Sequence, residues 1–189
     1  IITLFFPLYF STEAVEKGPG IAFSFQWQKQ NFIFLDNRSF RDKEHHIGEN
    51  QTQWVGEQLS NDHLNWLISG DQFFGAYHSF ESFEGNHKKE FNKFLSLLNK
   101  KKARYLFISG DRHMSELMKI PKTKVTGGSF EVTSSPVHSS VYKDALDRDP
   151  NPYRIHGVDG TWNFVTLEAQ KRGVWNVKSW GQEGNILFQ

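Results

Sequence analysis

The chain has 189 residues, which is the size of a single domain with a substantial hydrophobic core. Its 22 Lys and Arg residues nearly balance its 21 Asp and Glu residues, and it has no long basic stripe, which excludes the usual electrostatic pattern of a nucleic-acid-binding surface. The lack of Cys excludes disulfides, thiolate nucleophiles and Cys-type zinc sites, so any metal ion must be held by oxygen and imidazole ligands.

The chain opens with an apolar run at residues 1–10, which lacks the positively charged leader of a secretory signal. A bilayer span needs about 20 apolar residues. We therefore expect this run to face the core, and we expect no membrane span. After a turn at 18–20, alternation at 21–27 and an apolar run at 31–35 predict two strands. The second strand leads directly into Asp36, Asn37 and Arg38.

The middle of the chain predicts helices and buried strands in alternation. Asn50 is expected to cap a helix that ends at Leu59, and 66–69 predicts a short buried strand. Residues 86–99 predict an amphipathic helix, because Phe91, Phe94, Leu95 and Leu98 follow the i, i+3, i+4, i+7 spacing. The run at 104–109 predicts a further strand. This alternation favours an α/β fold with ligand-binding residues at the carboxyl ends of the strands.

The remainder of the chain predicts a more antiparallel region. Strands are expected at 130–133, 162–167, 173–177 and 186–188, and the polar, Pro-containing stretch 144–152 predicts a surface loop.

The sharpest chemical signal is Asp111 and His113, which follow the strand at 104–109 after a glycine. Residues i and i+2 in extended or tightly turned backbone project to one side, so a hard cation could take both ligands. The structural alternative is that Asp111 caps a turn and His113 is only partly buried.

Other polar residues have simpler interpretations. Asn86 and His87 follow Gly85 in a Gly-Asn-His triplet that resembles a motif of binuclear phosphoesterases, but the simpler interpretation is that Asn86 is a helix N-cap. The pair at 45–46 lies in a charged stretch and is expected in a solvated loop. The hydroxyls at 133–135 lack the Gly-x-Ser-x-Gly elbow of serine hydrolases.

Several short blocks occur in a fixed order along the chain. Residues 34–41 (FLDNRSFR) precede a Gly-x-x-Gln-x-x-Trp pattern at 48–54, and Ser-Gly-Asp-Arg-His at 109–113 precedes Glu-Val-Thr-Ser-Ser at 131–135. Weaker blocks lie at 83–86 (FEGN) and 162–164 (WNF). Together these blocks resemble, in order and spacing, the motifs of the alkaline phosphatase D (PhoD-like) metallophosphatases over nearly the whole chain.

The resemblance implies a metallophosphatase-like α/β sandwich of two mixed β-sheets flanked by helices, with a binuclear metal centre at the strand ends. It implies metal-dependent hydrolysis of phosphomonoesters or phosphodiesters, calcium and iron as the metal ions, and a periplasmic, cell-surface or secreted location. In that pattern Asp111 and His113 are metal ligands. Arg38, Asn86 and His87 are candidates for binding the phosphate-ester substrate, although Arg38 could also pair structurally with a carboxylate.

The upstream acidic motifs that supply the other ligands in that family do not occur here. We therefore expect residues 1–189 to be the C-terminal portion of a PhoD-like domain, either as a fragment or as a natural remnant, and to be inactive alone. The competing hypothesis is a non-catalytic binding or structural module that keeps the fold and contacts a partner through the aromatic loop 73–77. The sequence gives no prediction of the oligomeric state.

Overall fold

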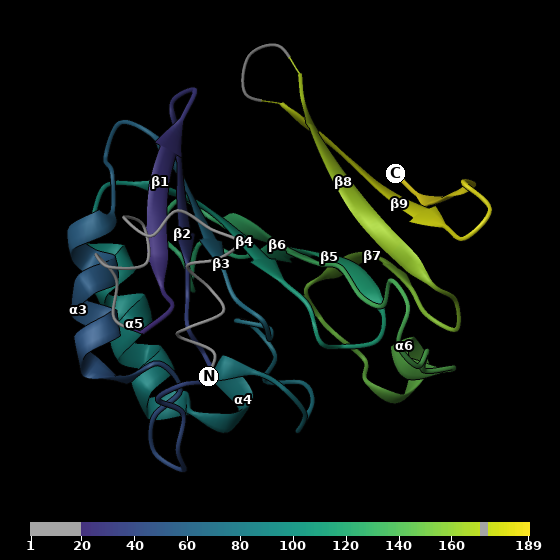
Figure 1. The fold of residues 1–189 in the computed structure, drawn as a ribbon, viewed down its shortest axis with the longest axis horizontal. Helices are drawn as coiled ribbons and strands as arrows, with labels where there is room; N and C mark the ends of the chain where they lie inside the picture. Colours follow the sequence, from purple (N-terminus) through teal and green to yellow (C-terminus); the bar gives the residue numbers. More distant parts are fainter. Residues whose placement is uncertain (1–19, 171–173) are drawn as a thin grey trace.

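The structure is a computed structural model that describes residues 20–170 and 174–189. Its main element is a seven-stranded mixed sheet in the order β1-β2-β3-β4-β6-β5-β7 (Figure 1). Strands β2, β3, β4 and β6 run parallel, so their carboxyl ends meet at one edge of the sheet. The strands are β1 (Phe23–Trp27), β2 (Gln30–Phe34), β3 (Leu64–Ile68), β4 (Arg104–Ser109), β5 (Ser115–Ile120), β6 (Ser129–Thr133) and β7 (Arg154–Val158).

Helices cover one face of this sheet. Parallel neighbours need a crossover connection, which α3 (Gly48–Gln58) provides between β2 and β3, and α4 (Phe83–Asn86) with α5 (Lys88–Lys100) between β3 and β4. Figure 1 shows α3 and α5 on the same side of the sheet. A short helix, α6 (Ala145–Arg148), precedes β7. No helix in the described part of the chain is long and apolar enough to cross a membrane.

The hydrophobic core lies between these helices and the sheet. Phe91, Phe94, Leu95 and Leu98 form the buried stripe of α5, as their spacing predicts. Phe107 of β4 lies at the centre, with its ring centroid 5.0 Å from those of both Phe73 and Phe74. The aromatic loop after β3 is therefore a core element, and the expectation that it contacts a partner is wrong for these two phenylalanines, which are fully buried.

A second sheet lies on the side opposite α3 and α5 (Figure 1). It consists of β8 (Asn163–Ala169), β9 (Trp175–Gly181) and β10 (Ile186–Phe188) in the order β10-β9-β8, and its strands are antiparallel. Trp175 packs edge-on against Trp66 of β3, with ring centroids 4.8 Å apart. The expected sandwich is confirmed in outline, but only the larger sheet is mixed. The expected flanking helices are found only in part, because α3 and α5 lie on the larger sheet and no described helix belongs to the segment of the smaller one.

Several boundaries differ from the sequence-based prediction. Asn50 does not cap α3, which begins at Gly48 without a side-chain cap hydrogen bond. Asn86 does not cap α5 either: it ends α4, whose own cap is the Ser82 hydroxyl, which accepts the Gly85 amide at 2.9 Å. Strands β5 and β7 were not predicted, and α6 lies inside the expected loop at 144–152. The apolar run at 1–10 lies outside the described residues.

Candidate functional site

Polar side chains gather where the parallel strands end. Backbone hydrogen bonds continue beyond the strands, from the Leu35 amide to the Ile68 carbonyl at 2.8 Å and from the Ser69 amide to the Ile108 carbonyl at 3.0 Å. The loops that follow β2, β3 and β4 therefore start side by side. This places the segments that carry Arg38, Asp71 and Asp111 at one edge of the sheet.

Asp36 shapes the turn that presents Arg38. Its buried carboxylate accepts the amides of Arg38 at 3.1 Å and Ser39 at 2.9 Å. Burial by itself would raise the pKa of Asp36, but these hydrogen bonds hold it below its usual value. Gln51 of α3 fixes the backbone of Asp36, because it accepts the Asp36 amide at 2.7 Å and donates to the Asp36 carbonyl at 2.9 Å.

Arg38 joins two loops through its guanidinium group. Nη2 lies 2.7 Å from Oδ2 of Asp111, and Nη1 lies 3.4 Å from Oε2 of Glu81. The side chains of Arg38 and Asp111 are 50% and 39% exposed, so both can reach solvent. Among the predicted site residues, this is the one pair that the described contacts bring together.

Asp71 is a buried carboxylate that anchors the neighbouring loops by hydrogen bonds, and it was not among the predicted site residues. Its Oδ1 accepts Nε2 of His46 at 3.0 Å and the Ser69 hydroxyl at 3.1 Å, and Asn37 donates to the same oxygen. Arg41 reaches the other oxygen at 3.4 Å. Burial would raise the pKa of Asp71, but the hydrogen bond and the charge of His46, together with Asn37 and Ser69, hold it below its usual value.

The expectation of a solvated loop at 45–46 is wrong for His46. Its ring is buried, stacks on Phe83 with centroids 4.3 Å apart, and points at Asp71. His45 does lie at the surface, where it hydrogen-bonds to Asp42. The sequence offered one signal for this anchor, since Asp71 follows β3 as Asp36 follows β2 and Asp111 follows β4. Nothing in the local pattern identified its histidine partner.

Asp111 and His113 have different neighbours in the structure. Both residues have a left-handed backbone, with φ of 55° and 54°. Asp111 points to Arg38, whereas the His113 amide donates to the Ser135 hydroxyl at 3.1 Å and its ring stacks on Tyr142 at 4.7 Å. Nδ1 of His113 donates to the Ser140 carbonyl at 2.5 Å, which leaves Nε2 available as an acceptor.

The donor chemistry of these two residues fits a metal ion in kind. A carboxylate oxygen suits a hard cation, and an imidazole whose other nitrogen donates to a carbonyl is the usual arrangement of a histidine ligand. The number of donors is small, however, because no group of three or more His, Asp or Glu residues suitable for a metal ion occurs within residues 20–170 and 174–189. Asp111 and His113 could therefore hold a cation only as part of a larger ligand set.

Asn86 and His87 are not brought to Asp111 by the described contacts. Asn86 donates to the Phe80 carbonyl at 2.9 Å, and Nε2 of the buried His87 donates to the Asp42 carbonyl at 2.9 Å. Both side chains therefore hold neighbouring loops together. A substrate role for either residue would require these hydrogen bonds to open.

His78, a further histidine in this loop, is also committed to structure. Its Nε2 donates to Gln72 at 2.8 Å, and its Nδ1 accepts the Phe80 amide at 3.1 Å. Burial and the nearby charge of Arg112 lower the pKa of His78 to about 4. The neutral ring thus has no free nitrogen for a metal ion.

Glu131 of β6 fixes the loop that carries Asp71. Its carboxylate accepts the amides of Phe73 and Phe74, both at 2.9 Å, and the Ser109 hydroxyl at 2.7 Å. Because the group is fully buried, desolvation raises the pKa of Glu131 to about 7, and the neighbouring Glu116 adds to the increase. This side chain joins three strand ends, which explains structurally the Glu at the start of the 131–135 block.

Comparisons with known proteins identify the fold and go no further. No family model matches the chain, and no curated protein matches it. A solved structure described as "Structure of PhoD" matches with a TM-score of 0.62 and 13% sequence identity, over 89% of this chain and 44% of that chain. The chain thus has a PhoD-like fold and spans less than half the length of that neighbour.

Proposed function

We propose that residues 1–189 supply part of the binuclear metal site of a metal-dependent phosphoesterase that hydrolyses phosphomonoesters or phosphodiesters. The observation that carries the proposal is the Arg38–Asp111 pair at the strand ends of a PhoD-like sheet. A carboxylate and a guanidinium at such an edge provide one group for a cation and one for an anionic ester. The remaining metal ligands would come from outside the described residues.

The proposed roles follow from the present contacts. Asp111 would offer its carboxylate and His113 its Nε2, with the His113 ring oriented by the Ser140 carbonyl. When bound, divalent or ferric ions, with calcium and iron suggested by the resemblance, would supply a Lewis acid for the ester. Arg38 would release Asp111 and bind a phosphate oxygen, because a planar guanidinium matches phosphate in charge and geometry.

Two further parts of the proposal rest on the resemblance. Asn86 and His87 stay as proposed substrate-side residues, which would have to leave the carbonyls of Phe80 and Asp42. A periplasmic, cell-surface or secreted location is also proposed on this basis.

The test uses the complete gene product that contains these residues. Asp111→Asn and His113→Gln are compared with His156→Gln, which changes an exposed histidine in β7. Metal content after dialysis is measured by mass spectrometry, and hydrolysis is measured with p-nitrophenyl phosphate and bis(p-nitrophenyl) phosphate. We expect the two site variants to lose about tenfold or more in metal affinity and rate, and the control to keep both. Residues 1–189 alone should show no turnover.

Unchanged metal content in both site variants would refute the ligand assignment. A complete gene product that binds no metal and hydrolyses neither ester would favour the second candidate, a non-catalytic module. The structure offers this candidate one favourable observation, which is the small number of metal-binding side chains among the described residues.

A further inference from the structure

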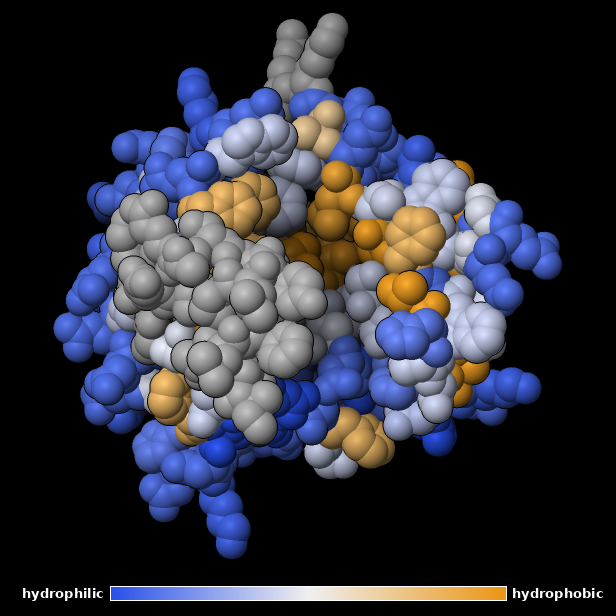
Figure 2. Space-filling model, viewed as in Figure 1, coloured by the Kyte–Doolittle hydropathy of each residue, from blue (hydrophilic) through white to orange (hydrophobic). Residues whose placement is uncertain are grey.

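The face of the large sheet opposite α3 and α5 is only partly covered. Near the tip of the β8–β9 hairpin, the two sheets leave a groove of about 860 Å³. Figure 2 shows apolar side chains at the bottom of a hollow on this side of the molecule. The apolar lining includes Leu64, Leu106, Phe130, Ala169, Val174 and Trp175.

The aromatic surface extends from this groove across the neighbouring strands. The Trp66 ring touches Trp175 and also stacks on Phe32, with centroids 5.3 Å apart. Phe32 in turn stacks on Phe25 at 5.0 Å, and Phe25 is 45% exposed. The exposed ring of Phe25 thus continues the apolar lining of the groove, and apolar side chains that gather at a surface groove favour the binding of another molecule.

Strand β8 borders this surface with an edge that no other strand covers from Leu167 to Ala169, whereas its first part contacts residues 134–136. The Asn163 amide donates to the Pro136 carbonyl at 2.8 Å and the Val165 amide to the Ser134 hydroxyl at 3.0 Å, so alternate amides of β8 point away from β9. The amides of Leu167 and Ala169 point the same way by this alternation. No strand of the described part of the chain pairs with this edge. It can therefore accept hydrogen bonds from, and donate them to, an added strand.

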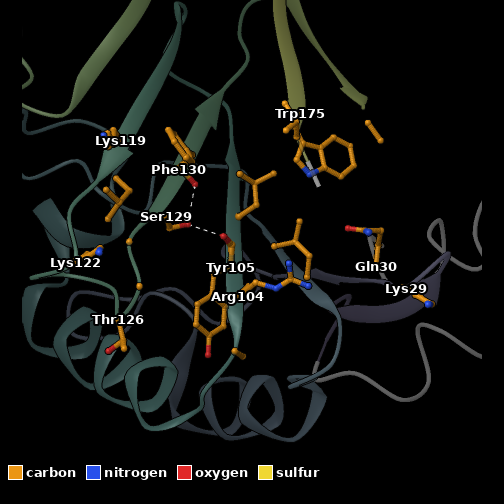
Figure 3. Close-up of a pocket in the computed structure, with 18 of the residues that line it drawn as sticks. Lys29, Gln30, Arg104, Tyr105, Lys119, Lys122, Thr126, Ser129, Phe130 and Trp175 are labelled. Carbon is orange, nitrogen blue, oxygen red and sulfur yellow. Dashed lines mark hydrogen bonds between the residues drawn. The ribbon is translucent and has the colours of Figure 1, made fainter. Parts of the chain in front are cut away.

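The charge around the groove has one sign. Lys29, Arg104, Lys119 and Lys122 line it, and the described residues contribute no Asp or Glu to the lining. Figure 3 shows these four cations around the same hollow as Trp175 and Phe130. Carboxylates would complement this rim, whereas a cationic ligand would be repelled.

We propose that this surface binds an extended segment of another polypeptide, which pairs with the free edge of β8 as an added strand. Apolar side chains at alternate positions of the segment fill the groove. Carboxylates at the end beside Ala169 pair with the lysines and Arg104. The free edge supplies the backbone hydrogen bonds, the groove selects the side chains, and the cationic rim selects the charge.

The probe is a fluorescein-labelled peptide in which Val alternates with Thr and two Glu residues close each end. Fluorescence anisotropy measures its binding to the protein. Leu167→Pro removes an edge-facing amide without removing a hydrogen bond of the β8–β9 ladder, and Leu167→Ala is the matched control that keeps the amide. We expect saturable binding that weakens at least about tenfold in Leu167→Pro and far less in Leu167→Ala. The double variant Lys119→Glu and Lys122→Glu should weaken it as well.

A second measurement does not depend on any variant folding correctly. Two N-methylated forms of the peptide are compared, one methylated at the Val residues and the other at the Thr residues. Only one of these two forms loses the amides that face β8. That form should not bind, and the other should. No saturable binding of the unmodified peptide would overturn the proposal, as would equal binding of both methylated forms.

Two results would assign the surface to a different occupant and so contradict the proposal. One is a concentration-dependent dimer in light scattering that Leu167→Pro abolishes, which indicates a second copy. The other is binding that occurs only after residues 1–19 are removed, which indicates a segment of this chain. None of these results depends on metal binding or hydrolysis.

Discussion

Replacing the buried Glu131 with Gln tests how the strand ends are held together. The side chain lies at the junction of β4, β6 and the loop after β3, where it accepts three hydrogen bonds. Desolvation raises its pKa to about 7 from an ordinary 4.5, so the folded protein holds the protonated form more tightly than the unfolded chain does. Glu131→Gln has the charge of that protonated form and a similar shape, but its NH2 group cannot accept one of the two backbone amides that the carboxylate oxygens accept.

The size and sign of the effect follow from proton linkage. The stability contributed by this raised pKa is present below pH 4.5 and is lost as the pH rises toward about 7. At about 1.4 kcal/mol per pH unit, the wild-type protein should lose about 3 kcal/mol over this window relative to Glu131→Gln. The lost amide hydrogen bond lowers the stability of the variant by the same amount at every pH, so the prediction concerns the difference between the two proteins. That difference should move in favour of the variant by about 3 kcal/mol between pH 4.5 and pH 8.

The assay is urea denaturation followed by tryptophan fluorescence at a series of pH values. Other groups titrate in both proteins, so the difference between their free energies of unfolding isolates Glu131. Glu183→Gln, at an exposed position, is the matched control for the loss of one glutamate side chain. If the difference between Glu131→Gln and wild type does not change between pH 4.5 and pH 8, the reasoning on the pKa of Glu131 is refuted.

Three further predictions concern the site and its support. Asp71→Asn should destabilise the protein by about 3 kcal/mol in chemical denaturation, because it removes the buried carboxylate that His46, Asn37 and Arg41 contact and leaves Arg41 with Glu81 alone. A change below about 1 kcal/mol would contradict an anchoring role. Arg38→Ala should change the free energy of unfolding by less than about 1 kcal/mol, since its ion pairs are exposed. It should nevertheless weaken the inhibition of the complete gene product by inorganic phosphate. Unaltered inhibition would exclude Arg38 from substrate binding. Gly75→Ala should destabilise the protein by about 1–3 kcal/mol, because the new Cβ would lie 2.3 Å from Oγ of Ser82. Gly127→Ala is the control for backbone strain, since Gly127 has a φ of 90° but open space around it.

The sequence predicted those elements whose side-chain pattern is regular. The buried strands β3 and β4 are nearly continuous apolar runs, and α5 has a clear apolar stripe, so both kinds of element were recognised near their observed bounds. β5 was missed because the buried Glu116 interrupts its pattern and is compensated only by distant partners, including Arg154 at 2.7 Å. β7 is a polar edge strand that contains a glycine.

The candidate site was predicted only where its residues follow strands. Arg38 and Asp111 were both identified, because each lies just after a buried strand, and the structure pairs them. Asp71 is held by Asn37, Arg41 and His46, which all lie in the loop between β2 and α3. These partners are 25 to 34 residues away along the chain, so no local pattern reveals them. Asn86 and His87 form a recognisable triplet, but the fold uses them to hold loops.

The charged side chains at the strand ends form two parts, one held in place by several contacts and one an exposed ion pair that can exchange partners. Asp71 is buried and holds Arg41, which contacts Glu81, so this part is fixed by several hydrogen bonds. Arg38 and Asp111 are half exposed, and such an ion pair contributes no more than about 1 kcal/mol. A cation could therefore replace the guanidinium on Asp111, and a phosphate could replace the carboxylates on Arg38, at little cost to folding. The three carboxylates of Asp71, Glu81 and Asp111 face the two guanidinium groups of Arg38 and Arg41. In the proposed function, this excess of negative charge would favour the binding of a cation before that of an anionic ester.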